Sequence, residues 1–256
     1  DPHRPYGGGK NGKKHFERIK SSKTFTNQEV VVPEFIPDLP DTRKEMAAYC
    51  TSVRRLDDMM GTILDELKKS GHYDNTIVIF LSDHGMSLPF AKTNCYVQST
   101  KTPLIIRWPE KIAEGTSDKE HMISTVDLMP TILEAVEISS DAPTDGRSFL
   151  PLLKGDSQEG RDAVYTQFNH VHGRNPYPMR SVITKKYSYI FNPWSNGERS
   201  YNAEPMAGFS FKAMKRAGEK DPLIRDRVEH LEHRSVEEFY DLKKDPHSTK
   251  NLLNSK

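Results

Sequence analysis

An acid, an imidazole and a nearby ammonium group are the side chains of this sequence best suited to chemistry. Asp83 and His84 follow an apolar, β-branched run within residues 75–82, Gly85 comes next, and Lys92 lies a short way downstream. Carboxylates and imidazoles are common metal ligands, and a lysine ammonium is a compact positive charge for an anion. A metal site followed by an anion-binding lysine is what the handling of sulfate or phosphate esters requires.

The apolar run predicts a buried parallel strand over residues 75–83. Such a strand would deliver Asp83 and His84 to its carboxyl end, where open α/β sheets place their active sites. A loop through Lys92 then leads to a second strand-like run at residues 103–108. The sequence therefore predicts that the metal-type pair and the lysine lie at one edge of a sheet.

Helical and antiparallel segments surround these strands. Residues 42–70 predict an amphipathic helix, because apolar side chains recur at three- and four-residue steps between a Thr42–Glu45 capping-box pattern and Gly71. A second helix is expected to begin near Asp127. Residues 163–168 and 180–191 predict antiparallel strands. The highly charged residues 215–232 predict a solvent-facing helical insertion.

Several motifs carry a resemblance to a known family. Ser82-Asp83-His84-Gly85 with a downstream lysine resembles an element of the sulfatases of the alkaline phosphatase superfamily. Four other motifs resemble elements of the same family, and all five stand along the chain in the family's order. The four are the Asp-Pro-His-Arg element at residues 1–5, an Asp-Leu-x-Pro-Thr helix at 126–133, a Gly-Arg-Ser loop at 146–153 and a closing Tyr-Asp-Leu signature at 238–252. Residues 1–5, Pro89 and residues 177–182 lean towards the heparan N-sulfatase (sulfamidase) branch.

The resemblance implies a fold and a domain organisation. The fold would be α/β, with an alkaline-phosphatase-like, mostly parallel sheet sandwiched by helices. Residues 1–154 would be the C-terminal part of the catalytic domain, and residues 155–256 a small antiparallel-sheet subdomain. The family places a Cys or Ser that is oxidised to formylglycine, together with further acidic metal ligands, in its N-terminal half. We therefore expect this chain to be the C-terminal half of a sulfatase, with the missing N-terminal half as its partner and no activity by itself.

The resemblance also assigns roles to particular side chains. Asp83 and His84 would hold Ca²⁺, Lys92 would bind the sulfate group as a catalytic residue, and His3 would help to protonate the leaving group. His170, His172 and Arg180 are candidate contacts to the substrate, a sulfated carbohydrate such as a glycosaminoglycan.

One cysteine imitates the formylglycine motif. Cys50 and Arg54 have the required separation, but Ser52 stands where the family needs Pro or Ala. The periodicity places Cys50 in the middle of the predicted helix at residues 42–70, where a nucleophile could not reach a substrate. We therefore expect that Cys50 is not the nucleophile.

Composition excludes some functions and leaves others open. The 37 basic and 36 acidic residues nearly balance, so no global field favours nucleic acid. With two cysteines, disulfides do not organise the fold. No apolar run is long enough to span a bilayer. A periplasmic or secreted location is implied by the family alone.

Two other functions remain open at this stage. A phosphodiesterase or phosphonate hydrolase of the same superfamily would keep the fold and change the chemistry, although Lys92 at the anion site favours sulfate. A non-catalytic protein that binds sulfated glycans would keep the pocket without a nucleophile.

Overall fold

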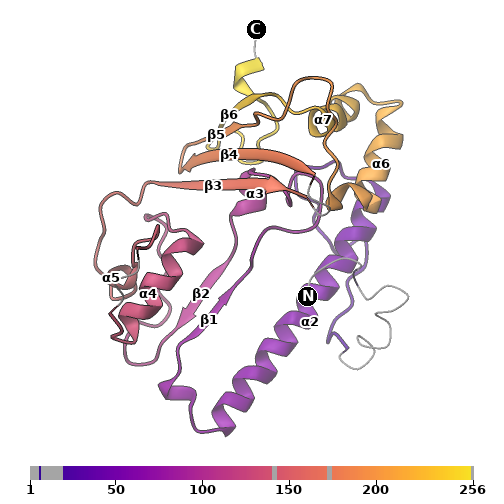
Figure 1. Cartoon of the computed structure of the whole chain (residues 1–256). Coiled ribbons are helices and arrows are strands. Elements are labelled where there is room, and N and C mark those ends of the chain that lie inside the picture. The colour runs from indigo at the N-terminus through magenta and orange to yellow at the C-terminus, as the bar shows by residue number, and fades with distance from the viewer. Residues whose placement is uncertain (1–5, 7–19, 140–142, 172–174, 255–256) are drawn as a thin grey trace.

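The computed structural model describes residues 6, 20–139, 143–171 and 175–254, which form two antiparallel sheets and several helices (Figure 1). Strands β1 (Val78–Leu81) and β2 (Leu104–Arg107) make a two-stranded sheet. Strands β3 (Ala163–His170), β4 (Pro176–Thr184), β5 (Tyr187–Phe191) and β6 (Glu237–Asp241) form the second sheet in chain order. The helices are α2 (Pro40–Lys69), α3 (Val97–Thr100), α4 (Leu128–Ala135), α5 (Leu150–Leu153), α6 (Phe209–Gly218) and α7 (Pro222–Glu232), with short 3₁₀ turns η1 (Tyr73–Asn75), η2 (Thr125–Asp127), η3 (Glu204–Ala207) and η4 (Leu252–Asn254).

Helix α2 confirms the long predicted helix but not its predicted cap. It begins at Pro40, two positions before the expected Thr42, and its N-cap residue Leu39 makes no side-chain cap hydrogen bond. Glu45 instead accepts hydrogen bonds from the backbone N–H and the hydroxyl of Ser210, at 2.8 and 2.6 Å, and so ties α2 to α6. Neither α2 nor any other helix of the described residues has the length and hydropathy that a membrane span needs.

Strand β1 differs from the buried parallel strand that the sequence predicted. It pairs antiparallel with β2, with Val78 opposite Arg107 and Leu81 opposite Leu104, and Leu81 is 38% exposed. The apolar run predicts the strand correctly, but a short apolar run alone does not fix its pairing direction. Ile79 of β1 and Ile106 of β2 line one apolar pocket together with Leu128 of α4 and Leu153 of α5.

Two of the sequence motifs are joined by one buried aspartate. Asp127 accepts hydrogen bonds from the backbone N–H of Ser124 at 2.9 Å and of Arg147 at 2.8 Å, and pairs with Arg161 at 2.6 Å. A Cβ on Gly146 would lie 2.0 Å from the carbonyl oxygen of Val126, so only glycine permits this approach. The residues of both motifs therefore act as scaffold.

The C-terminal residues form the four-stranded sheet with α6 and α7 at one end of the molecule (Figure 1). The sequence predicted strands here, and β3, β4 and β5 confirm them. The prediction that residues 215–232 face solvent is wrong in part, because Val228 and Leu231 of α7 are buried with Phe211 of α6. The proposed division of the chain after residue 154 stays a prediction.

The loop that follows β1 is deeply buried although it is irregular. Leu88, Ala91, Cys95 and Tyr96 are completely buried, and Phe90 nearly so. They belong to one hydrophobic cluster with residues of the four-stranded sheet and of α2, α6 and α7, such as Met179, Met46, Phe211 and Leu231. The predicted loop is therefore part of the core.

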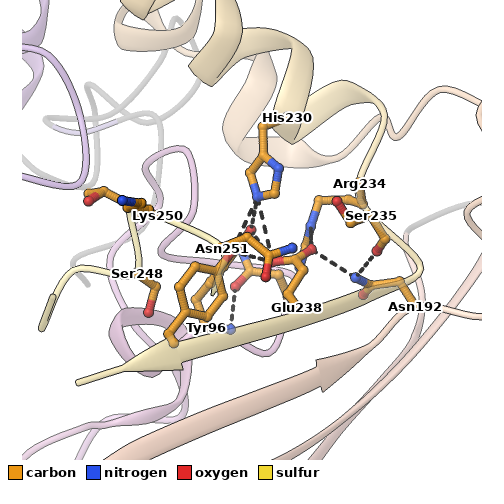
Figure 2. A network of polar contacts seen from close by, with 12 residues as sticks. Tyr96, Asn192, His230, Arg234, Ser235, Glu238, Ser248, Lys250 and Asn251 are labelled. Atoms are coloured by element: carbon orange, nitrogen blue, oxygen red, sulfur yellow. Dashed lines mark hydrogen bonds and ion pairs between the residues drawn. The ribbon is translucent and has the colours of Figure 1, made fainter. Parts of the chain in front are cut away.

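A buried ion pair joins this loop to the C-terminal sheet (Figure 2). Arg234 and Glu238 are both fully buried, with Nε of Arg234 2.6 Å from Oε1 of Glu238. The other oxygen of Glu238 accepts hydrogen bonds from the hydroxyls of Tyr96 at 2.8 Å and Tyr240 at 2.6 Å. Burial by itself would raise the pKa of Glu238, but the charges and hydrogen bonds of Arg234 and His230 together outweigh burial, and the pKa is lowered. Glu238 is therefore a carboxylate that holds Tyr96 in place.

Replacing Arg234 tests this ion pair. Arg234→Ala leaves the Glu238 carboxylate buried without its counter-charge, which typically lowers the free energy of unfolding by about 3–5 kcal/mol. Denaturant unfolding of the complete protein measures the loss. Arg225 is an exposed arginine of α7, and Arg225→Ala should change the free energy of unfolding by less than about 0.5 kcal/mol. Equal effects of the two substitutions would contradict the role given to the ion pair.

Candidate active site

Asp83 and His84 lie just beyond β1 and contact each other. The carboxylate of Asp83 accepts a hydrogen bond from the backbone N–H of His84 at 3.0 Å. Its other oxygen, Oδ2, lies 3.2 Å from Nε2 of the His84 ring. The Asp83 side chain is 83% exposed and the His84 side chain 38% exposed. The pair is therefore accessible to an ion or a substrate.

The ring of His84 is oriented as a metal ligand would be. Its Nδ1 lies 2.8 Å from the carbonyl oxygen of Gly85, and a carbonyl can only accept, so Nδ1 carries the ring proton. In the neutral ring, Nε2 then turns a lone pair towards Oδ2 of Asp83, and the two lone pairs repel unless a proton or a metal ion lies beside them. Metal-binding histidines fix their tautomer through a carbonyl in this way.

Lys92 is held in an anion-binding arrangement. Its side chain is 10% exposed, and Nζ lies 3.1 Å from Oε2 of Glu204. The buried hydroxyl of Ser87 also donates to Glu204, with 2.8 Å to Oε1 and 2.7 Å to Oε2. An ammonium group and a hydroxyl therefore surround one carboxylate, which shows that this position accepts a negatively charged group.

Gly85 brings the Asp83–His84 pair against the Lys92 loop. Its backbone N–H donates to the carbonyl oxygen of Ser99 at 2.9 Å. A Cβ at position 85 would lie 2.0 Å from the carbonyl oxygen of Gln98 and 2.5 Å from that of Ala91. The chain beside His84 thus touches the chain beside Lys92, a close approach that only glycine allows.

The backbone around Lys92 is strained and is fixed by side chains. Phe90 and Thr93 have φ values of 68° and 61°, a region that non-glycine residues rarely adopt. The side chain of Asn94 donates to the carbonyl oxygen of Lys92 at 2.8 Å. The hydroxyl of Tyr201 donates to the carbonyl oxygen of Thr93 and, at 2.9 Å, to its hydroxyl. Strain that is held in this way is a common feature of functional loops.

The remaining predicted site residues are only partly placed. His3 and His172 lie outside the described residues. His170 is exposed at the end of β3, opposite Pro176. Arg180 is exposed on β4, with its guanidinium donating to the carbonyl oxygen of Met179 at 2.7 Å. Their roles in substrate binding stay predictions.

Cys50 lies within α2, as the sequence predicted. Burial raises the pKa of its thiol, which makes the reactive thiolate less available.

Sequence reasoning did not find Ser87, Tyr201 or Glu204. Ser87 and Glu204 are 117 positions apart in the chain. The short separation of Ser87 from Lys92 in the sequence was a local sign that Ser87 could belong to the site. No local pattern pointed to Glu204.

The chemistry of the Asp83–His84 pair fits Ca²⁺ in part. Calcium takes about six to eight ligands, nearly all of them oxygens. Asp83 supplies carboxylate oxygens, whereas His84 supplies a nitrogen. Among the residues that the structure describes, no group of three or more His, Cys, Asp or Glu side chains is arranged to hold a metal. The pair therefore fits as one side of a site whose other ligands would come from elsewhere.

An exposed acid–imidazole pair set against the Lys92 loop has the side-chain chemistry for a cation and an anion side by side. Comparison with known families identifies the class of protein. Residues 3–138 match the sulfatase family, and residues 83–198 match the family N-sulphoglucosamine sulphohydrolase, C-terminal. The chain belongs to the sulfatase family.

Individual relatives agree with this assignment. Human N-sulphoglucosamine sulphohydrolase is 31% identical over 258 residues, which cover 94% of this chain and 50% of that protein. A solved structure in complex with its substrate, D-glucosamine-2-N,6-O-disulfate, has a TM-score of 0.57 at 22% identity and covers 83% of this chain and 37% of its own. A phosphonate monoester hydrolase of Agrobacterium radiobacter has a TM-score of 0.57 at 20% identity, over 82% and 37% of the two chains.

These likenesses confirm the predicted alkaline-phosphatase-like α/β fold. The chain spans half the length of the human relative.

Replacing Gly85 tests whether the close approach builds the site. In Gly85→Ala the new Cβ would meet the carbonyl oxygens of Gln98 and Ala91, so the Asp83–His84 pair must move relative to Lys92. A displacement of about 1 Å can reduce activity by about a hundredfold. Turnover by the complete protein measures the effect. Gly61 of α2 has no atom within 4 Å of an added Cβ, so Gly61→Ala should leave activity unchanged. Full activity of Gly85→Ala would contradict the proposed arrangement.

Proposed function

We propose that the complete protein is a Ca²⁺-dependent, formylglycine-type sulfatase. It hydrolyses sulfate esters or sulfamates of a sulfated carbohydrate such as a glycosaminoglycan, in a periplasmic or secreted location. The observation that carries the proposal is the contact at Gly85, which sets an exposed acid–imidazole pair against a loop whose lysine already holds a carboxylate. The identity to human N-sulphoglucosamine sulphohydrolase supports an N-sulfated or O-sulfated glucosamine as substrate.

Each residue has a part in this proposal. Asp83 and His84 hold the metal, which when bound supplies a positive charge that polarises a sulfate oxygen. Lys92 donates hydrogen bonds to the oxygens of the sulfate group, where negative charge gathers in the transition state. His3 protonates the leaving oxygen or nitrogen. The nucleophile and the further acidic ligands would come from other residues of the complete protein.

A sulfate substrate is favoured over a phosphorus substrate by the lysine. The fold itself does not decide, because a phosphonate monoester hydrolase shares it. At this position the chain has the ammonium group of Lys92, which is a donor for the oxygens of the sulfate group and not a ligand for a second cation.

The activity of the complete protein tests the proposal. We expect release of sulfate from N-sulfated or O-sulfated glucosamine, and mass spectrometry should find formylglycine at the family's nucleophile position. Faster hydrolysis of aryl phosphate diesters than of aryl sulfates would favour a phosphodiesterase instead. An unmodified or absent nucleophile would favour a protein that only binds sulfated glycans.

Substitution of Lys92 tests its assigned role. Lys92→Ala removes a donor to the transferring group and should lower kcat by about 10²–10³-fold, as loss of one oxyanion donor does. Lys92→Arg keeps the charge and should retain more activity. Lys101, an exposed lysine near the same loop, gives the matched control Lys101→Ala, with activity near that of the unchanged protein. A Lys92→Ala protein with full activity would remove Lys92 from the mechanism.

Metal removal tests Asp83 and His84. Chelation should abolish sulfate release, and Ca²⁺ should restore it more effectively than Zn²⁺, because the proposed ligand set is rich in oxygen. Asp83→Asn should raise the Ca²⁺ concentration needed for half-maximal activity by about tenfold or more. The matched substitution Asp74→Asn, at an exposed carboxylate before β1, should not. Undiminished turnover after complete chelation would reject the metal site.

A further inference from the structure

Glu204 sets a carboxylate against the proposed sulfate-binding lysine. Its Oε2 lies 3.1 Å from Nζ of Lys92, and Glu204 lies outside both segments that match known families, residues 3–138 and 83–198. The Glu204 side chain is 37% exposed, whereas that of Lys92 is 10% exposed. One face of the carboxylate therefore touches the lysine while another reaches solvent.

The carboxylate is held in place from several sides. Ser87, which is 3% exposed, donates its hydroxyl to Glu204, with 2.8 and 2.7 Å to the two oxygens. The segment that carries Glu204 is also fixed to the same loop, because the hydroxyl of buried Tyr201 donates to Thr93 at 2.9 Å. Pro205, the next residue, is buried in η3. Glu204 is thus a built part of the Lys92 site rather than a loose surface side chain.

This position places a negative charge beside any anion that Lys92 binds. An ammonium group has three N–H donors that point in different directions. A second oxygen bound by the same ammonium group at a normal distance would lie about 5 Å from Oε2 of Glu204, from tetrahedral geometry at the nitrogen. At that separation two negative charges repel each other measurably even in a water-like dielectric.

We propose that Glu204 is a specificity-determining residue that makes the Lys92 site favour singly charged sulfate groups over doubly charged anions. This inference rests on the proposed function, in which Lys92 binds the sulfate group. A sulfate ester or a sulfamate carries one negative charge. Free sulfate carries two, and a phosphate monoester carries between about 1.5 and 2 near neutral pH. Repulsion from Glu204 is therefore about twice as strong for free sulfate and for a doubly charged phosphate monoester as for a sulfate ester or a sulfamate.

Two consequences follow for the reaction. The substrate enters as a monoanion and meets the weaker repulsion, whereas the product, free sulfate, is a dianion that Glu204 drives out of the site. Phosphate monoesters, which match sulfate esters in shape, are disfavoured by their charge. The carboxylate thus weakens product inhibition and separates sulfate esters from phosphate monoesters without a steric contact.

The experiment compares two inorganic anions of similar shape and different charge. Calorimetry at low ionic strength measures the dissociation constants of sulfate (charge two) and sulfamate (charge one) for the complete protein and for Glu204→Gln. One charge pair about 5 Å apart in a water-like dielectric is worth about fourfold in affinity. Glu204→Gln should therefore bind sulfamate about fourfold more tightly and sulfate about fifteenfold more tightly. Glu198→Gln, at an exposed carboxylate, removes the same charge elsewhere and should change neither constant.

Each outcome decides the inference. A larger gain for sulfate than for sulfamate supports it, and Glu204→Ala should give the same order if Glu204→Gln does not fold. Equal gains for both anions would mean that Glu204 only competes for the ammonium group of Lys92, and no gain would mean that it does not act on the anion; either result overturns the inference. Sulfate release by the unchanged protein is measured separately. If release occurs and the gains are equal, this inference alone fails; if release is absent, the proposed function fails.

Discussion

The whole candidate site depends on one buried stretch of irregular chain, residues 86–96. Loops normally lie at the surface because their backbone groups need partners. This loop is instead enclosed by α2, α6, α7 and the four-stranded sheet, and its polar groups are paired by side chains such as Asn94 and Tyr201. Positive φ angles at Phe90 and Thr93 persist because the surroundings fix them. The position of Lys92 is fixed because the backbone of its loop is held by these buried contacts.

Charges in this region form a graded series from the core outwards. Glu238 and Arg234 are fully buried and matched, so their pair serves to hold the loop through Tyr96. Lys92 and Glu204 are partly open, and the exposed part of Glu204 can act on an incoming anion. Asp83, the most exposed of these carboxylates, accepts from the backbone N–H of His84 and turns its other oxygen towards the His84 ring, an arrangement that suits a cation. The same side-chain chemistry thus serves scaffold, selectivity and metal binding according to depth.

Local patterns predicted the helices and strands of the chain better than its long-range contacts. The three-and-four spacing found α2, and the apolar run found β1, because such periodicities are written within one segment. The predicted capping box of α2 is wrong, and Glu45 instead accepts a hydrogen bond from Ser210, which lies far along the chain. The antiparallel pairing of β1 and the position of Glu204 beside Lys92 arise when separate segments of the chain come together. A pattern within one short stretch of sequence does not contain that information. Asp83, His84 and Lys92 could be named from their order in one motif, but Ser87, Tyr201 and Glu204 could not.

The burial of the Lys92 loop by residues that come much later in the chain has a consequence for folding during synthesis on the ribosome. Glu238 emerges 146 positions after Lys92, which at about 5–20 residues per second corresponds to roughly 7–30 seconds of synthesis. During that interval the four-stranded sheet that covers Leu88, Phe90 and Tyr96 is incomplete, and exposed apolar surface of this kind invites aggregation or chaperone capture. A nascent chain that stalls before β6 would already contain Asp83, His84 and Lys92. It would lack the last strand of the sheet that buries the Lys92 loop.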